Sequence, residues 1–306
     1  MLRFKHRRGR QMKQIIRDRH GSLRNGWWIL AFLVLFLASQ PVYRVVSKAI
    51  QHQGFEGAWL APLPVLFLTL VTYACLRLRR EGLAAVGLRA DLTWARELFY
   101  GAALGMVLIG LVTGLIFAAG GVRFSLDPAR SLNALAMGTW MFAWAVVLEE
   151  LLFRGFVFQR LVDGIGAWPT LLGMGLLFAI AHWGNPGMEG PTLAWATLDT
   201  ALGAILMGLA YLRTRSLALP IGLHFGWNWA QGALLGFDVS GFDQAGWLLP
   251  ELLAKPQWLT GGAFGPEASI FAVLVDTVAV VLMWRWKGSA QARPAVPAPV
   301  AAVATD

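Results

Sequence analysis

Eight long apolar windows, separated by shorter polar segments, constrain this chain more than any other feature of its sequence. Each is about 17–25 residues long, which is the length that an α-helix needs to cross the hydrocarbon core of a bilayer. A segment inside a bilayer must satisfy its own backbone hydrogen bonds, and a helix does so. We therefore expect an all-α, polytopic membrane protein, a bundle of about eight transmembrane helices. The windows cover residues 27–45, 58–76, 98–120, 132–152, 167–183, 193–212, 217–237 and 268–286.

The composition supports a membrane protein and excludes other classes. Of the 306 residues, 57% are hydrophobic and only 14% are charged, whereas soluble domains are roughly a quarter charged. The single cysteine, Cys75, excludes an intrachain disulfide. A long basic stretch precedes the window at 27–45, and no small-residue cleavage site follows that window. We therefore expect a retained span rather than a cleavable signal peptide.

Positive charge is concentrated at the N-terminus and in alternate loops. The net charge is +9, and a run of Lys and Arg residues lies within the first 25 positions. Such a run could bind nucleic acid, but before an apolar span it is more simply a cytoplasmic anchor at an anionic membrane surface. The segments 77–96, 154–166, 213–216 and the end after 285 are also rich in arginine and lysine. This bias predicts eight spans with both termini in the cytoplasm, without a nucleic-acid partner, and the composition fits a bacterial inner membrane.

Changes in composition divide the chain into six parts. The last part, residues 288–306, is rich in Ala and Pro and is expected to be disordered. The extracytoplasmic loop, residues 238–267, is expected to carry a short interfacial helix around 247–253. In chain order the parts are a basic cytoplasmic segment (1–26), N-terminal transmembrane helices (27–131), a core with the polar motifs (132–237), an extracytoplasmic loop (238–267), the last transmembrane helix (268–287) and the tail (288–306).

Two adjacent glutamates lie within the fourth window, and an arginine follows shortly after its end. A charged side chain near the centre of a membrane helix costs from roughly 3 to more than 10 kcal/mol, so it is expected to face a polar interior. Glu150 and Arg154 are four residues apart on one helix face and can form an ion pair. Glu149 is rotated by about 100° from Glu150. We expect this helix to continue to about residue 162, beyond the hydrocarbon.

Further polar residues fall at a similar depth in two other windows. The turn between the fourth and fifth windows lies near 164–166, and Glu149 and His182 lie at nearly equal distances on its two sides. At a rise of about 1.5 Å per residue, an antiparallel hairpin places them opposite each other. His182 follows Phe178 by one turn, and His224 precedes Asn228 by one turn in the seventh window. These positions predict a polar cavity within the bundle.

The residue types suggest hydrolysis of a peptide bond by activated water. A carboxylate in a low-dielectric cavity is a competent general base, and a histidine opposite it can share and orient the water. A second histidine and an asparagine amide can donate hydrogen bonds to a tetrahedral oxyanion. This scheme requires no cofactor. Glu149, or Glu150, with His182 and His224 could instead bind zinc as three ligands with an open position.

Three non-catalytic interpretations stay open. The Glu150–Arg154 pair could be structural, even beside a catalytic site. The cavity could bind a toxin or partner in a non-enzymatic immunity or scaffold protein. A proton-coupled transporter could use the glutamates with Asp199 and Asp276, but no inverted repeat is apparent. Asp199 and Asp276 lie in the sixth and eighth windows, where we expect interior, hydrogen-bonded carboxyls.

Three short motifs resemble those of the CPBP group of intramembrane proteases, which comprises type II CAAX prenyl endopeptidases and bacteriocin-processing or abortive-infection-type relatives. The motifs are Glu-Glu-Leu-Leu-Phe-Arg-Gly at 149–155, Phe-Ala-Ile-Ala-His at 178–182 and His-Phe-Gly-Trp-Asn at 224–228. The resemblance covers roughly 132–237 and implies an endopeptidase acting on a membrane-bound or lipidated protein or peptide. It implies that Glu149 and His182 activate water and that His224 and Asn228 form the oxyanion site. Glu150, Arg154 and Phe178 are then supporting residues.

Overall fold

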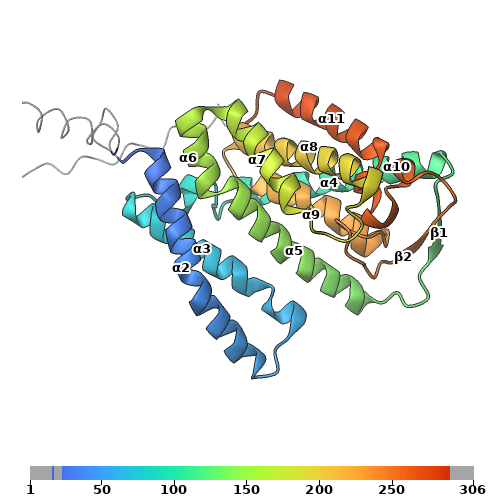
Figure 1. Ribbon diagram of the computed structural model, residues 1–306, viewed down its shortest axis with the longest axis horizontal. Helices are drawn as coiled ribbons and strands as arrows, with labels where there is room; N and C mark the ends of the chain where they lie inside the picture. The colour runs from blue at the N-terminus through green and yellow to red at the C-terminus, as the bar shows by residue number, and fades with distance from the viewer. Residues whose placement is uncertain (1–15, 17–22, 290–306) are drawn as a thin grey trace, which may run out of the picture.

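The protein is described by a computed structural model that places residue 16 and residues 23–289. The basic segment predicted at 1–26 and the tail predicted at 288–306 lie almost wholly outside the described residues. The described part is mainly helical, with one short two-stranded sheet (Figure 1). In chain order its principal elements are α2 (Asn25–Gln51), α3 (Pro62–Leu78), α4 (Leu92–Ala118), β1 (Val122–Leu126), α5 (Leu132–Arg154), α6 (Phe156–Ile165), α7 (Ala167–Ala181), α8 (Gly190–Thr214), α9 (Ala218–Trp229), β2 (Leu248–Leu252), α10 (Gln257–Thr260) and α11 (Ile270–Arg285).

A helix occupies each of the eight apolar windows, but the helices differ in length and apolarity. Four described segments are long and apolar enough to cross a membrane: α2, Gly57–Leu78 (which contains α3), α4 and α8. They identify an integral membrane protein, and the count of eight spans stays a prediction. In the seventh window, α9 has 12 residues and passes into a π-helical turn, Ala230–Leu234. A regular helix of that length rises only about 18 Å, which is less than the thickness of the hydrocarbon core.

The loops expected on the cytoplasmic side meet at one end of the bundle. The Leu217 amide, just before α9, donates to the Gly87 carbonyl, which lies before α4. Arg213, at the end of α8, donates to the Met283 carbonyl of α11, and the Ser289 amide donates to the Arg213 carbonyl. At the opposite end, β1 and β2 form an antiparallel pair. These contacts place the start of α9, the segment before α4 and the ends of α8 and α11 at one end of the bundle, while their cytoplasmic location stays a prediction.

Local sequence signals fix where three of the helices begin. Asp91, Ser131 and Ser269 have extended backbones, and each side chain accepts a hydrogen bond from the backbone three residues later, at α4, α5 and α11 respectively. Such N-caps satisfy a backbone amide that has no partner inside the helix. Two of these caps start the helices that carry Glu149 and Asp276, so they set the register of both carboxyls.

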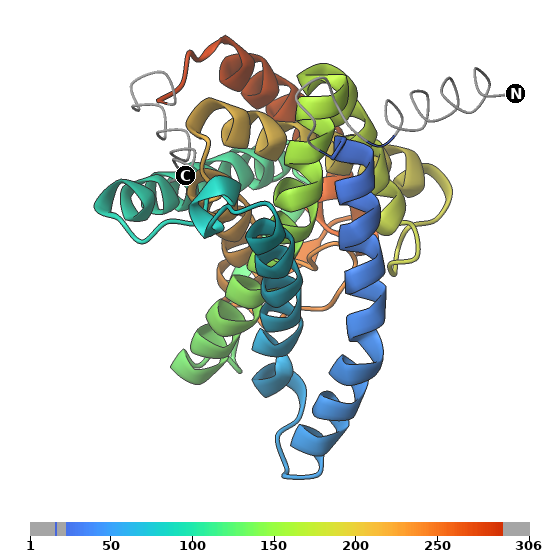
Figure 2. The same ribbon diagram turned by 90° about the vertical axis from the view of Figure 1, so that its left-hand side faces the viewer.

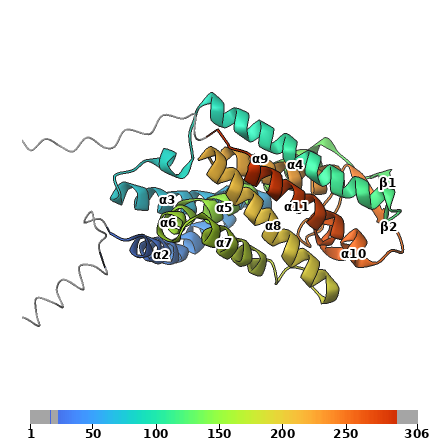
Figure 3. The same ribbon diagram turned by 90° about the horizontal axis from the view of Figure 1, so that it is seen from above.

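Glycines allow α4 and α9 to pack backbone against backbone in the interior. An added Cβ on any of four glycines would collide with main-chain atoms of the other helix. Small residues four apart are a common basis of close helix packing in membranes. Both helices run in the same direction, and Figure 3 shows α4 along one outer side of the bundle with α9 beside it. The contact fixes the depth of the motif on α9. Its glycines are Gly101 and Gly105 on α4, and Gly222 and Gly226 on α9.

The first two helices form a peripheral hairpin. Figure 2 shows α2 and α3 extending beyond the rest of the bundle. Along α2, Phe32 is the buried residue of the described helix, and it stacks against Phe156 of α6 with ring centroids 5.7 Å apart. Most other apolar side chains of α2 remain exposed, which suits a helix surrounded by lipid.

Two local predictions were wrong. The interfacial helix expected around 247–253 is instead strand β2, because its backbone pairs with β1, with Pro250 opposite Phe124. The fourth helix does not continue to residue 162, because it ends at Arg154. Gly155 has a non-helical ψ of −133° and separates α5 from α6. The all-α expectation therefore holds apart from one short β-ribbon.

Candidate active site

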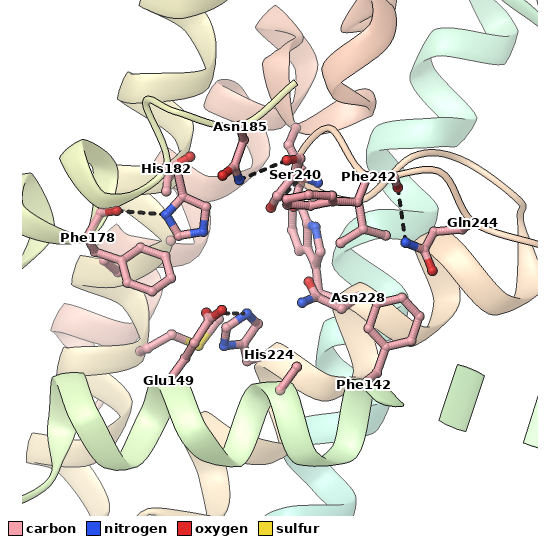
Figure 4. Close-up of a pocket in the computed structure, with 18 of the residues that line it drawn as sticks. Phe142, Glu149, Phe178, His182, Asn185, His224, Asn228, Ser240, Phe242 and Gln244 are labelled. Atoms are coloured by element: carbon pink, nitrogen blue, oxygen red, sulfur yellow. Dashed lines mark hydrogen bonds and ion pairs between the residues drawn. The ribbon is translucent and has the colours of Figure 1, made fainter. Parts of the chain in front are cut away.

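A cavity of about 790 Å³ lies within the bundle, and polar side chains of five helices or their ends face it. Glu149 of α5 and His224 and Asn228 of α9 lie on one side of the view in Figure 4, and His182 lies across from Glu149. Asn185 and Ser240 bound the cavity beyond them. The structure thus brings together the four residues that the sequence singled out for catalysis.

The adjacent glutamates have different environments, because α5 turns by about 100° between them. Glu150 is fully buried. The Glu149 side chain is 35% exposed and lines the cavity. Its carboxylate lies 3.7 Å from Nε2 of His224, which is longer than a hydrogen bond. Glu149 therefore retains acceptor capacity toward a molecule in the cavity.

Glu150, Arg154 and His224 form a buried polar network, called here the Glu150 network. Oε1 of Glu150 accepts from Nη1 of Arg154 at 2.9 Å and lies 2.9 Å from Nδ1 of His224. Nη2 of Arg154 donates to the Ala204 carbonyl of α8 at 3.0 Å. The predicted ion pair is present, and it also joins α5, α8 and α9.

This network fixes the orientation of the His224 ring. Because Glu150 accepts from Arg154, its ionised carboxylate takes a hydrogen bond from Nδ1–H of His224. Nε2 then points toward Glu149 and the cavity. His224 can donate from Nε2 only when both ring nitrogens carry protons, and the two flanking carboxylates balance that charge.

His182 is held in the complementary way. Helix α7 ends at Ala181, one residue earlier than His182, which takes the cap position. Its Nδ1 lies 2.7 Å from the Phe178 carbonyl, which can only accept, so Nδ1 carries the proton. In the neutral ring, Nε2 therefore has a free lone pair. His182 can accept a proton or orient a water at that atom.

Phe178 supports both sides of the cavity through its ring and its carbonyl. Its ring centroid lies 4.6 Å from that of His182 and 5.1 Å from the guanidinium carbon of Arg154. Phe153 meets the same ring edge to face at 4.8 Å. These apolar contacts exclude water from one side of the Glu150 network, which strengthens its electrostatic interactions. Asn228, one turn after His224, is half-buried and lines the cavity.

Three further carboxyls face the cavity, and the sequence predicted an interior position for only two of them. Asp199, Glu267 and Asp276 form what we call the acidic wall, and all three are buried. Asp199 and Asp276 were expected to be hydrogen-bonded, but Oδ1 of each has no hydrogen-bond partner among the described residues. Glu267 was assigned to the outside loop. It folds inward because Ser240 N donates to its Oε2 at 2.7 Å. Burial raises the pKa of the Glu267 carboxyl, and the hydrogen bond from Ser240 opposes that rise.

A zinc site built from Glu149, His182 and His224 is the alternative to the water scheme. Within residues 23–289, no group of three or more His, Cys, Asp or Glu side chains has the arrangement of metal ligands. Nδ1 of His224 and Nδ1 of His182 are both engaged by the protein. The Nε2 atoms of both rings are not engaged in this way, so zinc binding by Glu149, His182 and His224 stays a prediction.

Residues 130–230 match the family model described as type II CAAX prenyl endopeptidase Rce1-like. This segment is similar to an Rce1-like domain. It contains α5, α6, α7, α8 and α9, which carry all three motifs, and the resemblance stated from those motifs is confirmed. The match covers about a third of the chain, so α2, α3, α4 and α11 lie outside it. No curated protein and no solved structure matches the chain.

Proposed function

We propose that the protein is an intramembrane endopeptidase that cuts membrane-associated or lipidated proteins or peptides with a glutamate-activated water. The observation that carries this proposal is the difference between Glu149 and its neighbour. Glu150 is enclosed in a network, whereas Glu149 presents a carboxylate to a cavity that also exposes His182, His224 and Asn228. The Rce1-like domain supports hydrolysis of this general kind.

The proposed reaction requires only groups that face the cavity. Glu149 takes a proton from water while Nε2 of His182 accepts a hydrogen bond from the same water. The oxygen attacks the carbonyl carbon of the scissile bond, and the carbonyl oxygen becomes an oxyanion. Nε2–H of protonated His224 and the Asn228 amide donate hydrogen bonds to it. Collapse breaks the C–N bond, and the proton held by Glu149 moves to the leaving amine nitrogen.

The Glu150 network has a positioning role in this scheme. It aims Nε2 of His224 at the cavity and ties α5 to α8 and α9. Arg154 and Glu150 do not reach the reacting atoms. We place the protein in the inner membrane of a bacterium with both termini in the cytoplasm, on the basis of the arginine-rich loops gathered at one end.

The decisive experiment compares the wild type with Glu149→Gln on lipidated peptide reporters in detergent or proteoliposomes. We expect the variant to lose cleavage by at least about a hundredfold while its unfolding temperature stays close to that of the wild type. Glu189→Gln, an exposed residue before α8, is the matched control. Unchanged cleavage in Glu149→Gln would refute the mechanism. Retained partner binding without cleavage of any reporter would favour an immunity or scaffold protein.

The same assay separates the water mechanism from a zinc mechanism. We expect cleavage to survive a chelator and no stoichiometric metal in the purified protein. Loss of activity in chelator, with recovery on adding zinc, would require Glu149, His182 and His224 to rearrange into a ligand set.

A further inference from the structure

The acidic wall lies in the same cavity as the proposed catalytic groups but comes from different elements. Asp199 lies on α8, Asp276 on α11, and Glu267 in the short turn before α11. An added Cβ at Gly203, one turn after Asp199, would lie 3.3 Å from Oδ2 of Asp276. The Asp276 carboxyl therefore rests against α8 at a point where α8 has no side chain. The three residues form one surface of the cavity.

The carboxyls of Asp199 and Asp276 lack partners. They are 4% and 3% exposed, and neither takes part in a hydrogen bond or salt bridge among the described residues. Arg154, the arginine that lines the cavity in the described part of the chain, is committed to Glu150 and to the Ala204 carbonyl. Buried carboxyls without a partner lose hydration without compensation. Such groups in a membrane protein mark sites for ligands or ions.

The acidic wall is close to the proposed reaction centre. All three carboxyls line the cavity that His182 and His224 also line. A group bound at the acidic wall would therefore share the cavity with the scissile bond. The cavity volume of about 790 Å³ is sufficient for several residues of a peptide.

We propose that Asp199, Glu267 and Asp276 form a subsite for the cationic side chain, lysine or arginine, of a substrate residue near the scissile bond. An ammonium or guanidinium group can donate hydrogen bonds to the free oxygens of both aspartates and balance their charge in a low-dielectric site. Glu267 is held by Ser240 and shapes the outer edge of the subsite. This inference rests on the proposed endopeptidase function and adds a preference for basic residues.

Binding to an inactive protein tests the subsite without requiring cleavage. The probes are fluorescent lipidated peptides that are identical except for lysine, arginine, norleucine or glutamate at one position, which is moved along the peptide. In the Glu149→Gln protein we expect the lysine or arginine peptide to bind about tenfold tighter than the norleucine peptide at one position. Glutamate at that position should weaken binding further. Equal affinities of the basic and norleucine peptides at every position would overturn the proposal.

Variants of the acidic wall provide a second test of the subsite. Asp199→Asn combined with Asp276→Asn should bind the lysine and norleucine peptides alike. Asp243→Asn, which removes the same charge at an exposed position of the cavity, should keep the preference. A preference that survives in the double variant would also overturn the subsite. If the double variant does not fold, the comparison of peptides on Glu149→Gln still decides.

Cleavage assays separate the two proposals. If wild type cleaves reporters but shows no preference for a basic residue in binding or in KM, the subsite fails and the endopeptidase function stands. If the preference is found in binding while Glu149→Gln cleaves as well as wild type, the mechanism fails and the subsite stands.

Discussion

The Glu150 network and the acidic wall are two sets of buried charges beside one cavity, and they differ in their partners. In the network, Oε1 of Glu150 has two charged or polar partners and Arg154 also reaches a backbone carbonyl, while Oε2 of Glu150 has no hydrogen-bond partner among the described residues. In the wall, Asp199 and Asp276 face the cavity without partners among the described residues. Glu150, Arg154, Asp199 and Asp276 all lie in helices with a high content of apolar residues.

This difference in partners distinguishes buried charges that hold helices together from buried charges that are available to bind a ligand. Breaking a buried pair leaves an uncompensated charge and is strongly destabilising. Removing a buried charge that has no partner relieves a desolvation cost. Substitutions in the two sets should therefore change stability with opposite signs, although both sets lie at the proposed site.

The largest expected effect concerns activity and compares the two histidines. His182→Ala should lower kcat by about 10²–10⁴-fold, because the free Nε2 near the attacking water is lost. Its unfolding temperature should change little, since its side chain makes one hydrogen bond to the protein. His224→Ala should lower both kcat and the unfolding temperature, because His224 also belongs to the Glu150 network. Reporter kinetics and thermal unfolding of both variants check this, and equal stability losses would contradict the distinction.

The second prediction concerns the loss of one charge from the Glu150 network. Arg154→Met should destabilise the protein by about 3–5 kcal/mol, because the buried Glu150 loses its guanidinium partner and keeps only His224. Glu150→Leu combined with Arg154→Met should recover much of that loss, since no unpaired charge remains. Detergent-based unfolding measures both variants. A double variant as unstable as Arg154→Met alone would show that Arg154 acts through packing on Phe178 rather than through the ion pair.

The third prediction concerns the acidic wall, where Asp199 and Asp276 have no hydrogen-bond partners among the described residues. At alkaline pH, where the buried carboxyl is ionised, Asp276→Asn should raise the stability of the ligand-free protein by about 1–3 kcal/mol, because a neutral amide is less costly to bury than a carboxylate. Asp91→Asn, which alters the N-cap of α4 on the exposed surface, is a control for the same chemical change and should be close to neutral. A loss of stability in Asp276→Asn would show that the carboxyl has a structural partner.

Much of the site could be predicted because depth along a helix follows directly from residue number. The spacing of Glu149 and His182 around the turn near residue 165 predicts that they face each other, and both line the cavity. Their catalytic roles stay predictions. Which glutamate would bind His224 could not be predicted, because it depends on the rotation of α5 about its axis. Packing sets that rotation and turns Glu150 toward α9.

Other features depend on contacts between distant segments. Strand β2 forms because it meets β1, more than a hundred residues earlier, and nothing local in 248–252 specifies that pairing. Glu267 enters the cavity because a turn near Ser240 captures it, so its position in an outside loop is misleading. The glycine pairs at 101 and 105 and at 222 and 226 were a visible signal for the close contact of α4 with α9.

The smallest expected effect is a pH dependence that comes from Glu267, the member of the acidic wall that does have a hydrogen-bond partner. Burial raises the pKa of this carboxyl, so the folded protein holds its proton more tightly than the unfolded chain does. Its contribution to stability is then fully present below the ordinary glutamate pKa of about 4.3 and is lost as pH rises through the folded-state value. Glu267→Gln should flatten the fall in unfolding temperature as pH rises above about 4.3, whereas Glu189→Gln should leave the profile as it is in the wild type. An unaltered pH profile in Glu267→Gln would mean that the Ser240 hydrogen bond offsets the burial completely, and Glu267 would then belong with the paired charges.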